Sequence, residues 1–225
     1  MKVAVLSESP PDESAIAILV EAVLGSPVER MDGPPLRSRG WPSVRSILPV
    51  VIKHLYFRTA ADGLVVVVDS DSPIAHRETQ TAAVCQDGCR LCELRVIART
   101  SLQQLPARPV SGSLKVAVGL AVPSIEAWYR VGVDRTVTEA AWIQAHTGLT
   151  PRLPYTKTSL KQAVYGTDRP PRRLSVTRAV EEAARLTTEL RDLSTAFPGF
   201  RALRDELERW LQPGFGQDQQ PGQRT

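Results

Sequence analysis

Residues 63–73 read GLVVVVDSDSP, and this stretch decides the predicted fold. Five apolar residues, 64–68, end abruptly at Asp69 and Asp71, which one serine separates. A short Val-rich run closed by Asp, Ser and Pro is typical of a strand that is buried on both faces. Open α/β sheets bind their ligands beyond the carboxyl ends of such strands. The stretch therefore predicts a central parallel strand with two carboxylates at its functional end.

The sequence on either side of this strand alternates between strand and helix patterns. Further strands are predicted over 2–6, 28–31 and 115–122. Helices are predicted from a cap at Asp12 or Ser14 to Gly25, over 43–59, and over 77–105 with an interruption near 87–88. This order implies a parallel sheet with right-handed crossovers. The predicted fold class is α/β: a parallel sheet flanked by helices, with a helical C-terminal extension.

The pattern changes after residue 130, where Pro- and Arg-rich loops join helices predicted over 138–148, 157–164, 175–193 and 200–211. We therefore divide the chain into an α/β domain over 1–130 and a helical extension over 131–212 that packs on it. The closing residues 213–225, PGFGQDQQPGQRT, have little apolar content to pack and are predicted to be a disordered tail.

Composition limits the classes of protein that this chain can belong to. Its 225 residues are 42% hydrophobic, which is enough to bury a core. The net charge of +4 is a weak indication of a nucleic-acid partner. No stretch approaches the ~18 apolar residues of a membrane span, and the apolar run after Lys2 is too short for a signal peptide. We expect a cytoplasmic protein without a membrane partner, whose cysteines are thiols or metal ligands rather than disulfides.

Acidic residues follow three of the predicted strands. Glu8 follows the first, Asp69 and Asp71 the third, and Glu126 comes just past the fourth. Parallel strands end at the same edge of a sheet, so these acids are expected to converge there, where Mg²⁺ or Mn²⁺ would offset their repulsion. If the backbone stays extended, Asp69 and Asp71 share one face. The alternative is that these acids cap helices and form turns.

These residues also carry a resemblance. SESPPDESAIAILVEAVLG (7–25) and VVVVDSD (65–71) resemble the Toprim domain of topoisomerases, bacterial primases and overcoming-lysogenization-defect nucleases. In that fold a glutamate follows the first strand and Asp-x-Asp the third. VPSIEAWYR (122–130), YTKTSLKQAVYG (155–166) and FPGFRALRDELERWL (197–211) are similar to a family of Toprim-like bacterial proteins of unassigned function, often found near defence or mobile-element genes.

The resemblance implies a nuclease that uses Mg²⁺ or Mn²⁺ to hydrolyse phosphodiesters. Glu8 would be a general acid/base or metal ligand, Asp69 and Asp71 metal ligands, and Glu126 a further ligand or catalytic group. The alternative is a non-catalytic Toprim-like module that binds a nucleotide, nucleic acid or a partner protein from a defence system. The choice between DNA and RNA and the oligomeric state are left open.

Phosphate binding requires cationic side chains, and several basic residues are candidates. Each of them has a solvated surface position as its alternative. The candidates are Arg37, Arg39, Lys157, Lys161, Arg169, Arg172 and Arg173.

The cysteines form a second cluster, in HRETQTAAVCQDGCRLC (76–92). If this segment is helical, Cys85, Cys89 and Cys92 lie on one face, and His76 completes a Cys₃His site for structural Zn²⁺. One alternative is a set of thiols on an amphipathic helix. Another is an iron–sulfur cluster, because radical-SAM enzymes share the Cys-x₃-Cys-x₂-Cys spacing, although they need a barrel of parallel strands that is not predicted here.

Overall fold

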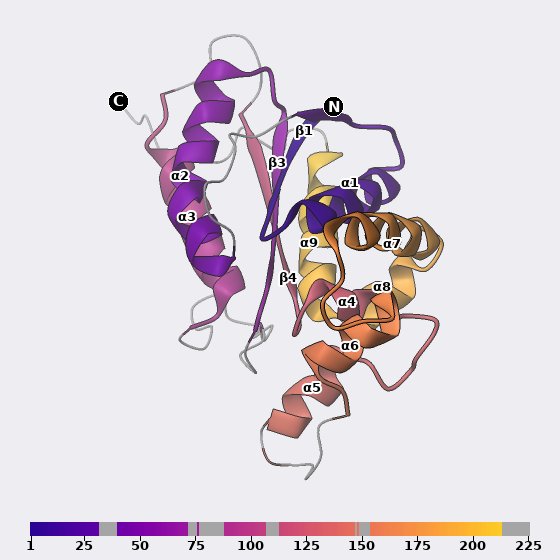
Figure 1. Ribbon diagram of the computed structural model, residues 1–225. Helices are drawn as coiled ribbons and strands as arrows, with labels where there is room; N and C mark the ends of the chain where they lie inside the picture. Colours follow the sequence, from indigo (N-terminus) through magenta and orange to yellow (C-terminus); the bar gives the residue numbers. More distant parts are fainter. Residues whose placement is uncertain are drawn as a thin grey trace.

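The computed structural model describes residues 1–31, 40–71, 76, 88–106, 113–146, 148 and 154–212. A four-stranded parallel sheet lies at the centre of the molecule (Figure 1), in the order β2-β1-β3-β4. Its strands are β1 (Lys2–Ser7), β2 (Glu29–Met31), β3 (Gly63–Asp69) and β4 (Lys115–Ala121). The α/β class predicted from the sequence is confirmed.

The position of β3 between two neighbours explains its unbroken apolar run. It pairs with β1 on one side and β4 on the other, and residues 63–68 are all buried. The parallel register sets Ser7 beside Val67 and Asp69 beside Ala121. The residues that follow β1, β3 and β4 therefore leave the sheet at one common edge.

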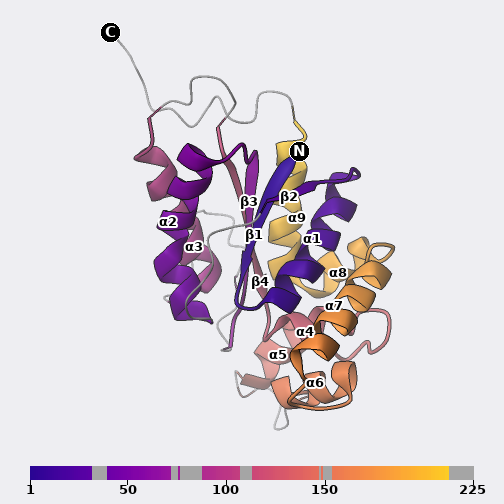
Figure 2. The same ribbon diagram turned by 45° about the horizontal axis from the view of Figure 1, so that its top comes forward.

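Helices cover both faces of the sheet (Figures 1 and 2). On one face lie α2 (Trp41–Arg58) and α3 (Arg90–Gln103), and on the other α1 (Pro10–Leu24) and α9 (Pro198–Trp210). The helix α7 (Arg172–Leu186) packs on α1, and α8 (Leu190–Ala196) packs on α9. Among the described helices, the first and the last therefore lie together on one face of the sheet.

Two glycines allow α9 to lie directly on β4. A Cβ atom on Gly199 would lie 2.0 Å from the carbonyl oxygen of Leu120, and one on Gly119 would lie 3.1 Å from the Leu203 side chain. Phe200 and Leu203 are buried at this contact. The helical C-terminal region thus shares one hydrophobic core with the sheet.

Three further helices lie beyond the carboxyl ends of the strands (Figure 1): α4 (Ile125–Trp128), α5 (Glu139–His146) and α6 (Lys157–Tyr165). The short α4 follows β4 and contacts α6. This arrangement brings α6, which is distant in sequence, to the edge where the predicted acids emerge.

Several predicted boundaries are corrected. The helix α1 begins at Pro10, because Ser9 rather than Asp12 or Ser14 is the N-cap and proline suits the first helical position. The helix predicted over 175–193 is two helices, α7 and α8, separated at residues 187–189. Residues 77–87 and the predicted tail 213–225 lie outside the described residues. No helix in the described ranges is long and apolar enough to cross a membrane.

Candidate functional site

Glu8 connects the ends of the two central strands. It follows β1, and its Oε1 accepts a hydrogen bond of 3.1 Å from the backbone N–H of Asp69, the last residue of β3. The two side chains are only 17% and 22% exposed. Burial and the nearby Asp71 carboxylate raise the pKa of Glu8, because both disfavour its ionised form.

Asp69 joins three elements through its two carboxylate oxygens. Its Oδ1 accepts the backbone N–H of Ile125 at 3.1 Å, and its Oδ2 accepts from the Lys157 ammonium at 3.1 Å. Lys157 is the first residue of α6, whose N-cap is Thr156. Burial raises the pKa of Asp69 well above its usual value, although Lys157 opposes the shift.

Asp71 does not share an extended strand face with Asp69. Its φ of 54° takes the backbone out of the extended region, so the geometry assumed for Asp-x-Asp does not hold. The Asp71 carboxylate instead pairs with the Lys157 ammonium and, at 2.8 Å, with the Arg90 guanidinium. Burial acts to raise the pKa of Asp71, but hydrogen bonds from these two cations lower it below its ordinary value.

Arg90, which the sequence analysis did not identify, is a second cation among the acids. It is the first residue of α3, and its Nη1 donates to the Asp69 carbonyl oxygen at 2.6 Å and lies 3.8 Å from Glu8 Oε1. The guanidinium stacks on the Trp41 ring, 4.9 Å from its centroid. No pattern in the sequence around Arg90, which follows Cys89 directly, indicated that it contacts the acids.

A cleft of about 690 Å³ opens at this edge of the sheet. One part of its lining comes from the strand ends and the start of α1, and carries carboxylates. The other part comes from α6 and the start of α7, and carries mostly basic groups. The acids are Glu8, Asp12, Asp69, Glu126 and Asp168, and the bases are Lys157, Lys161, Arg169 and Arg172.

Asp12 is a cleft residue that the sequence suggested only as a helix cap. The Ser9 hydroxyl donates to its Oδ2 at 2.6 Å. Burial raises the pKa of Asp12 to about 7, opposed by Ser9 and reinforced by the charges of Glu126 and Glu8. The available signal was its position in the first turn of a helix that starts at the carboxyl edge of the sheet.

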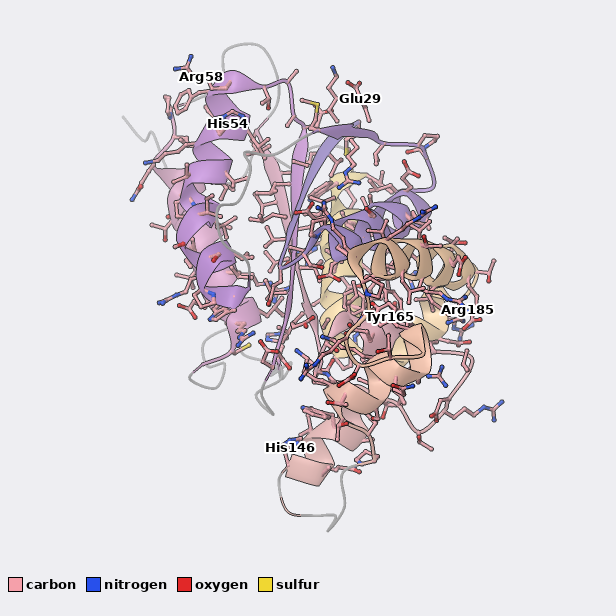
Figure 3. The ribbon with its side chains drawn as sticks, viewed as in Figure 1. Glu29, His54, Arg58, His146, Tyr165 and Arg185 are labelled. Carbon is pink, nitrogen blue, oxygen red and sulfur yellow. The ribbon has the colours of Figure 1, made fainter. Side chains whose placement is uncertain are left out.

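Hydroxyl groups surround the acids on the α4 and α6 side. Tyr165, labelled in Figure 3, is the last residue of α6 and lines the cleft. Burial and the charges of Glu126 and Asp12 raise its pKa. The buried hydroxyls of Ser124 and Tyr129 have no hydrogen-bond partner among the described residues. These two residues are buried behind the cleft lining rather than part of it.

Three basic candidates are not among the described residues that line the cleft. Arg37 and Arg39 lie outside the described residues, so their predicted role stays a prediction. Arg173 is described but is not among the residues that line the cleft.

The structure also brings together three of the four predicted zinc ligands. Cys89 Sγ and Cys92 Sγ lie 3.8 and 3.4 Å from His76 Nδ1, and the three ligand atoms are all within 4.8 Å of one another. Among the described residues this is the one group of at least three His, Cys, Asp or Glu side chains this compact. Cys89 is the N-cap of α3, so the helical spacing assumed for it is wrong, and Cys85 lies outside the described residues.

Comparison with known proteins finds no matching family model, and no curated protein or solved structure matches the chain. The site is therefore interpreted from its own geometry and chemistry.

Proposed function

We propose that the protein is a divalent-metal-dependent phosphoesterase that acts on nucleic acid, with the cleft at the carboxyl edge of the sheet as its active site. The observation that carries this proposal is the pairing of acidic and basic linings in one cleft. Carboxylates hold Mg²⁺ or Mn²⁺, and Lys and Arg side chains bind phosphate oxygens. The Toprim-like order of Glu8, Asp69 and Asp71 supports the same activity.

The acidic lining fits a hard divalent cation. Its candidate ligands are Glu8, Asp12, Asp69 and Glu126, all oxygen donors. Burial, together with the charges of neighbouring acids, raises the pKa of the first three, and a divalent cation bound among them would stabilise their ionised forms. The unsatisfied hydroxyls of Ser124 and Tyr129 add polar atoms nearby. A divalent ion bound there supplies a Lewis acid that polarises the phosphodiester.

Side chains, rather than the N-terminus of α1, would bind the phosphate. Pro10 and Pro11 have no N–H, while the N–H groups of Asp12 and Glu13 donate to Ser9. Anion binding therefore falls to the basic lining formed by Lys161, Arg169 and Arg172. Glu8, with its raised pKa, is suited to move a proton during hydrolysis.

In this proposal Asp71 is not a direct ligand of the metal. It lies outside the lining of the cleft and holds Lys157 and Arg90 through ion pairs. We propose that Lys157 leaves the carboxylates for a phosphate oxygen when metal and substrate enter. Asp71 then acts as a positioning residue, and its direct ligation of metal, implied by the resemblance, stays a prediction.

The ion pairs of Lys157 also favour a second candidate function. Its ammonium group contacts both Asp69 and Asp71, and so offsets their charge without a metal. A module that binds nucleic acid through the basic lining without cleaving it would use this arrangement as it stands. Metal binding and cleavage separate the two candidates.

The test measures cleavage of end-labelled single- and double-stranded DNA and RNA with Mg²⁺, Mn²⁺ or EDTA. Asp69→Asn keeps an oxygen for the Ile125 N–H, and Glu126→Gln keeps the side-chain shape, so both should fold. The control is Asp205→Asn, an exposed position on α9 that does not line the cleft. We expect metal-dependent cleavage that falls at least about 100-fold in the two cleft variants and is unchanged in the control.

The opposite result is equally clear. If no substrate is cleaved and calorimetry detects no binding of Mn²⁺ to the wild type, the phosphoesterase proposal is wrong. Nucleic-acid binding that Lys161→Ala and Arg169→Ala weaken would then support the binding module.

A further inference from the structure

The contacts of His76 with Cys89 and Cys92 match the spacing of ligands around a metal ion. Tetrahedral zinc, with Zn–S bonds of about 2.3 Å and Zn–N bonds of about 2.0 Å, holds sulfur and nitrogen about 3.5 Å apart. The two observed Sγ to Nδ1 distances are 3.4 and 3.8 Å. Both sulfur atoms thus lie at ligand spacing from the imidazole nitrogen, and the three ligand atoms are all within 4.8 Å of one another.

Hydrogen bonds alone explain this cluster less well. A ring nitrogen of neutral imidazole is either a single donor or a single acceptor, whereas two sulfur atoms approach the same Nδ1 atom. One metal ion accounts for both contacts at once. Thiolate and imidazole ligands favour zinc over Mg²⁺ or Mn²⁺, which prefer oxygen, so this site would select a different ion from the acidic cleft.

The cluster is connected to the strand-end acids Asp69 and Asp71 through Arg90. Cys89 is the N-cap of α3, Arg90 its first residue, and Cys92 lies two positions further on. The Arg90 guanidinium contacts the carbonyl oxygen of Asp69 and the carboxylate of Asp71. His76 follows Asp71 by five positions in the chain. An ion held by these ligands would therefore join the segment after β3 to the start of α3.

We propose that His76, Cys89 and Cys92 bind a zinc ion that fixes the start of α3 and so positions Arg90 against the strand-end acids. The proposed role of the zinc is to hold the start of α3 in place, and the chemistry of the cleft is separate from it. The inference does not require that the cleft be catalytic, since Arg90 holds the same contacts in a binding module.

The first experiment measures metal content. Purified wild-type protein is expected to hold about one zinc ion per chain by elemental analysis. Replacement of that zinc with Co²⁺ should produce the visible absorption of tetrahedral, thiolate-bound cobalt. Cys92→Ser and His76→Ala should lose both signals. The matched control is His54→Ala, on α2 near the opposite edge of the sheet (Figure 3), and it should retain them.

Wild-type protein decides this test even if a variant fails to fold. The proposed zinc site would be wrong if the folded wild type contains no zinc and shows no absorption of thiolate-bound cobalt when it is titrated with Co²⁺. Zinc that Cys92→Ser and His76→Ala both retain when folded would overturn the ligand assignment.

The second experiment tests the link to Arg90 without using activity. Hydrogen exchange is compared between zinc-loaded wild type, wild type stripped with a chelator and reloaded with Mg²⁺, and Arg90→Met. Stripping zinc should speed exchange at least about tenfold in the first turn of α3 and at Asp71, while α2 stays protected. Arg90→Met should speed exchange at Asp71 but keep its zinc. Unchanged exchange at both places after stripping would contradict the positioning role.

Discussion

Asp12 shows how a single partly buried carboxylate can set the pH response of the site. Its pKa rises from 3.8 to about 7, mainly because burial penalises the charged form. The folded protein therefore keeps a proton that the unfolded chain releases. The resulting stabilisation is present below about pH 4 and is lost as the pH rises to about 7.

Asp12→Asn should remove this part of the pH dependence, because the amide is neutral and still offers an oxygen to the Ser9 hydroxyl. In EDTA, we expect the free energy of unfolding of the wild type to fall relative to that of the variant between about pH 4 and about pH 7. Urea unfolding at several pH values measures the difference, with Asp205→Asn as the control. If the difference in the free energy of unfolding between wild type and Asp12→Asn does not change with pH, the pKa of Asp12 is not raised in the folded protein.

Lys157 and an incoming divalent cation should compete for the carboxylate of Asp69. Removing one positive charge in direct contact with two carboxylates makes cation binding more favourable. We expect Lys157→Met to bind Mn²⁺ on the order of tenfold more tightly than wild type in calorimetry. Lys161→Met is the matched control, because Lys161 lines the same cleft without an ion pair to a described carboxylate. Equal Mn²⁺ affinity in the wild type and both variants would count against a metal site at Asp69.

At the scale of elements, the contact between α9 and β4 determines how the last helix joins the sheet. The helix and the strand approach each other most closely at Gly199 and Gly119, where the absence of a side chain leaves room for the contact. Lys157 and Arg90, by contrast, reach the site because each is the first residue of a helix, α6 or α3. The placement of these helices therefore decides both the packing of the core and which cations contact the strand-end acids.

Gly199→Ala should displace α9, because its Cβ would overlap the carbonyl oxygen of Leu120 and backbone atoms cannot rotate away. We expect a loss of about 2–3 kcal/mol in the free energy of unfolding, measured with urea. The control is Gly166→Ala, where no atom lies within 4 Å of the added Cβ and only the positive φ is strained, at about 1–2 kcal/mol. A smaller loss at Gly199 than at Gly166 would contradict this packing.

For the whole molecule, the predicted boundary near residue 130 does not divide two independent cores. The described buried hydrophobic residues form one cluster that includes β4, α1 and α9. The helices α7 and α9 cover α1 and β4, so removing them would expose apolar side chains on both. Stability should therefore belong to the chain as a unit.

A chain that ends at residue 130 should lack a cooperative thermal transition and should aggregate, because Val118, Leu120 and Leu19 would lose much of their cover. A chain that ends at residue 212 should unfold at the same temperature as the full protein, since residues 213–225 are predicted to add no packed core. Circular dichroism and light scattering measure both. A cooperative transition in the 1–130 chain would establish it as an independent domain.

Much of the candidate site was predictable because strand ends are easy to locate. The apolar run of β3 and the parallel order of strands placed Glu8, Asp69 and Glu126 at one edge, and the structure brings them to the lining of one cleft. Asp12 was missed because an acid in the first turn of a helix has a common structural role. Arg90 was missed because the helix predicted over 77–105 placed it inside a helix, whereas the structure begins α3 at Arg90.

The sequence by itself determined the α/β class, the parallel sheet and the carboxylates at its carboxyl edge, because apolar periodicity and the succession of strands and helices are local properties of the chain. Only the tertiary structure decided which cations meet those carboxylates. Lys157 lies 88 residues from Asp69 in the chain, and its ammonium reaches the carboxylate because α6 folds back over the sheet edge. Electrostatic contacts depend on distance in space, and at such separations the packing of helices sets that distance.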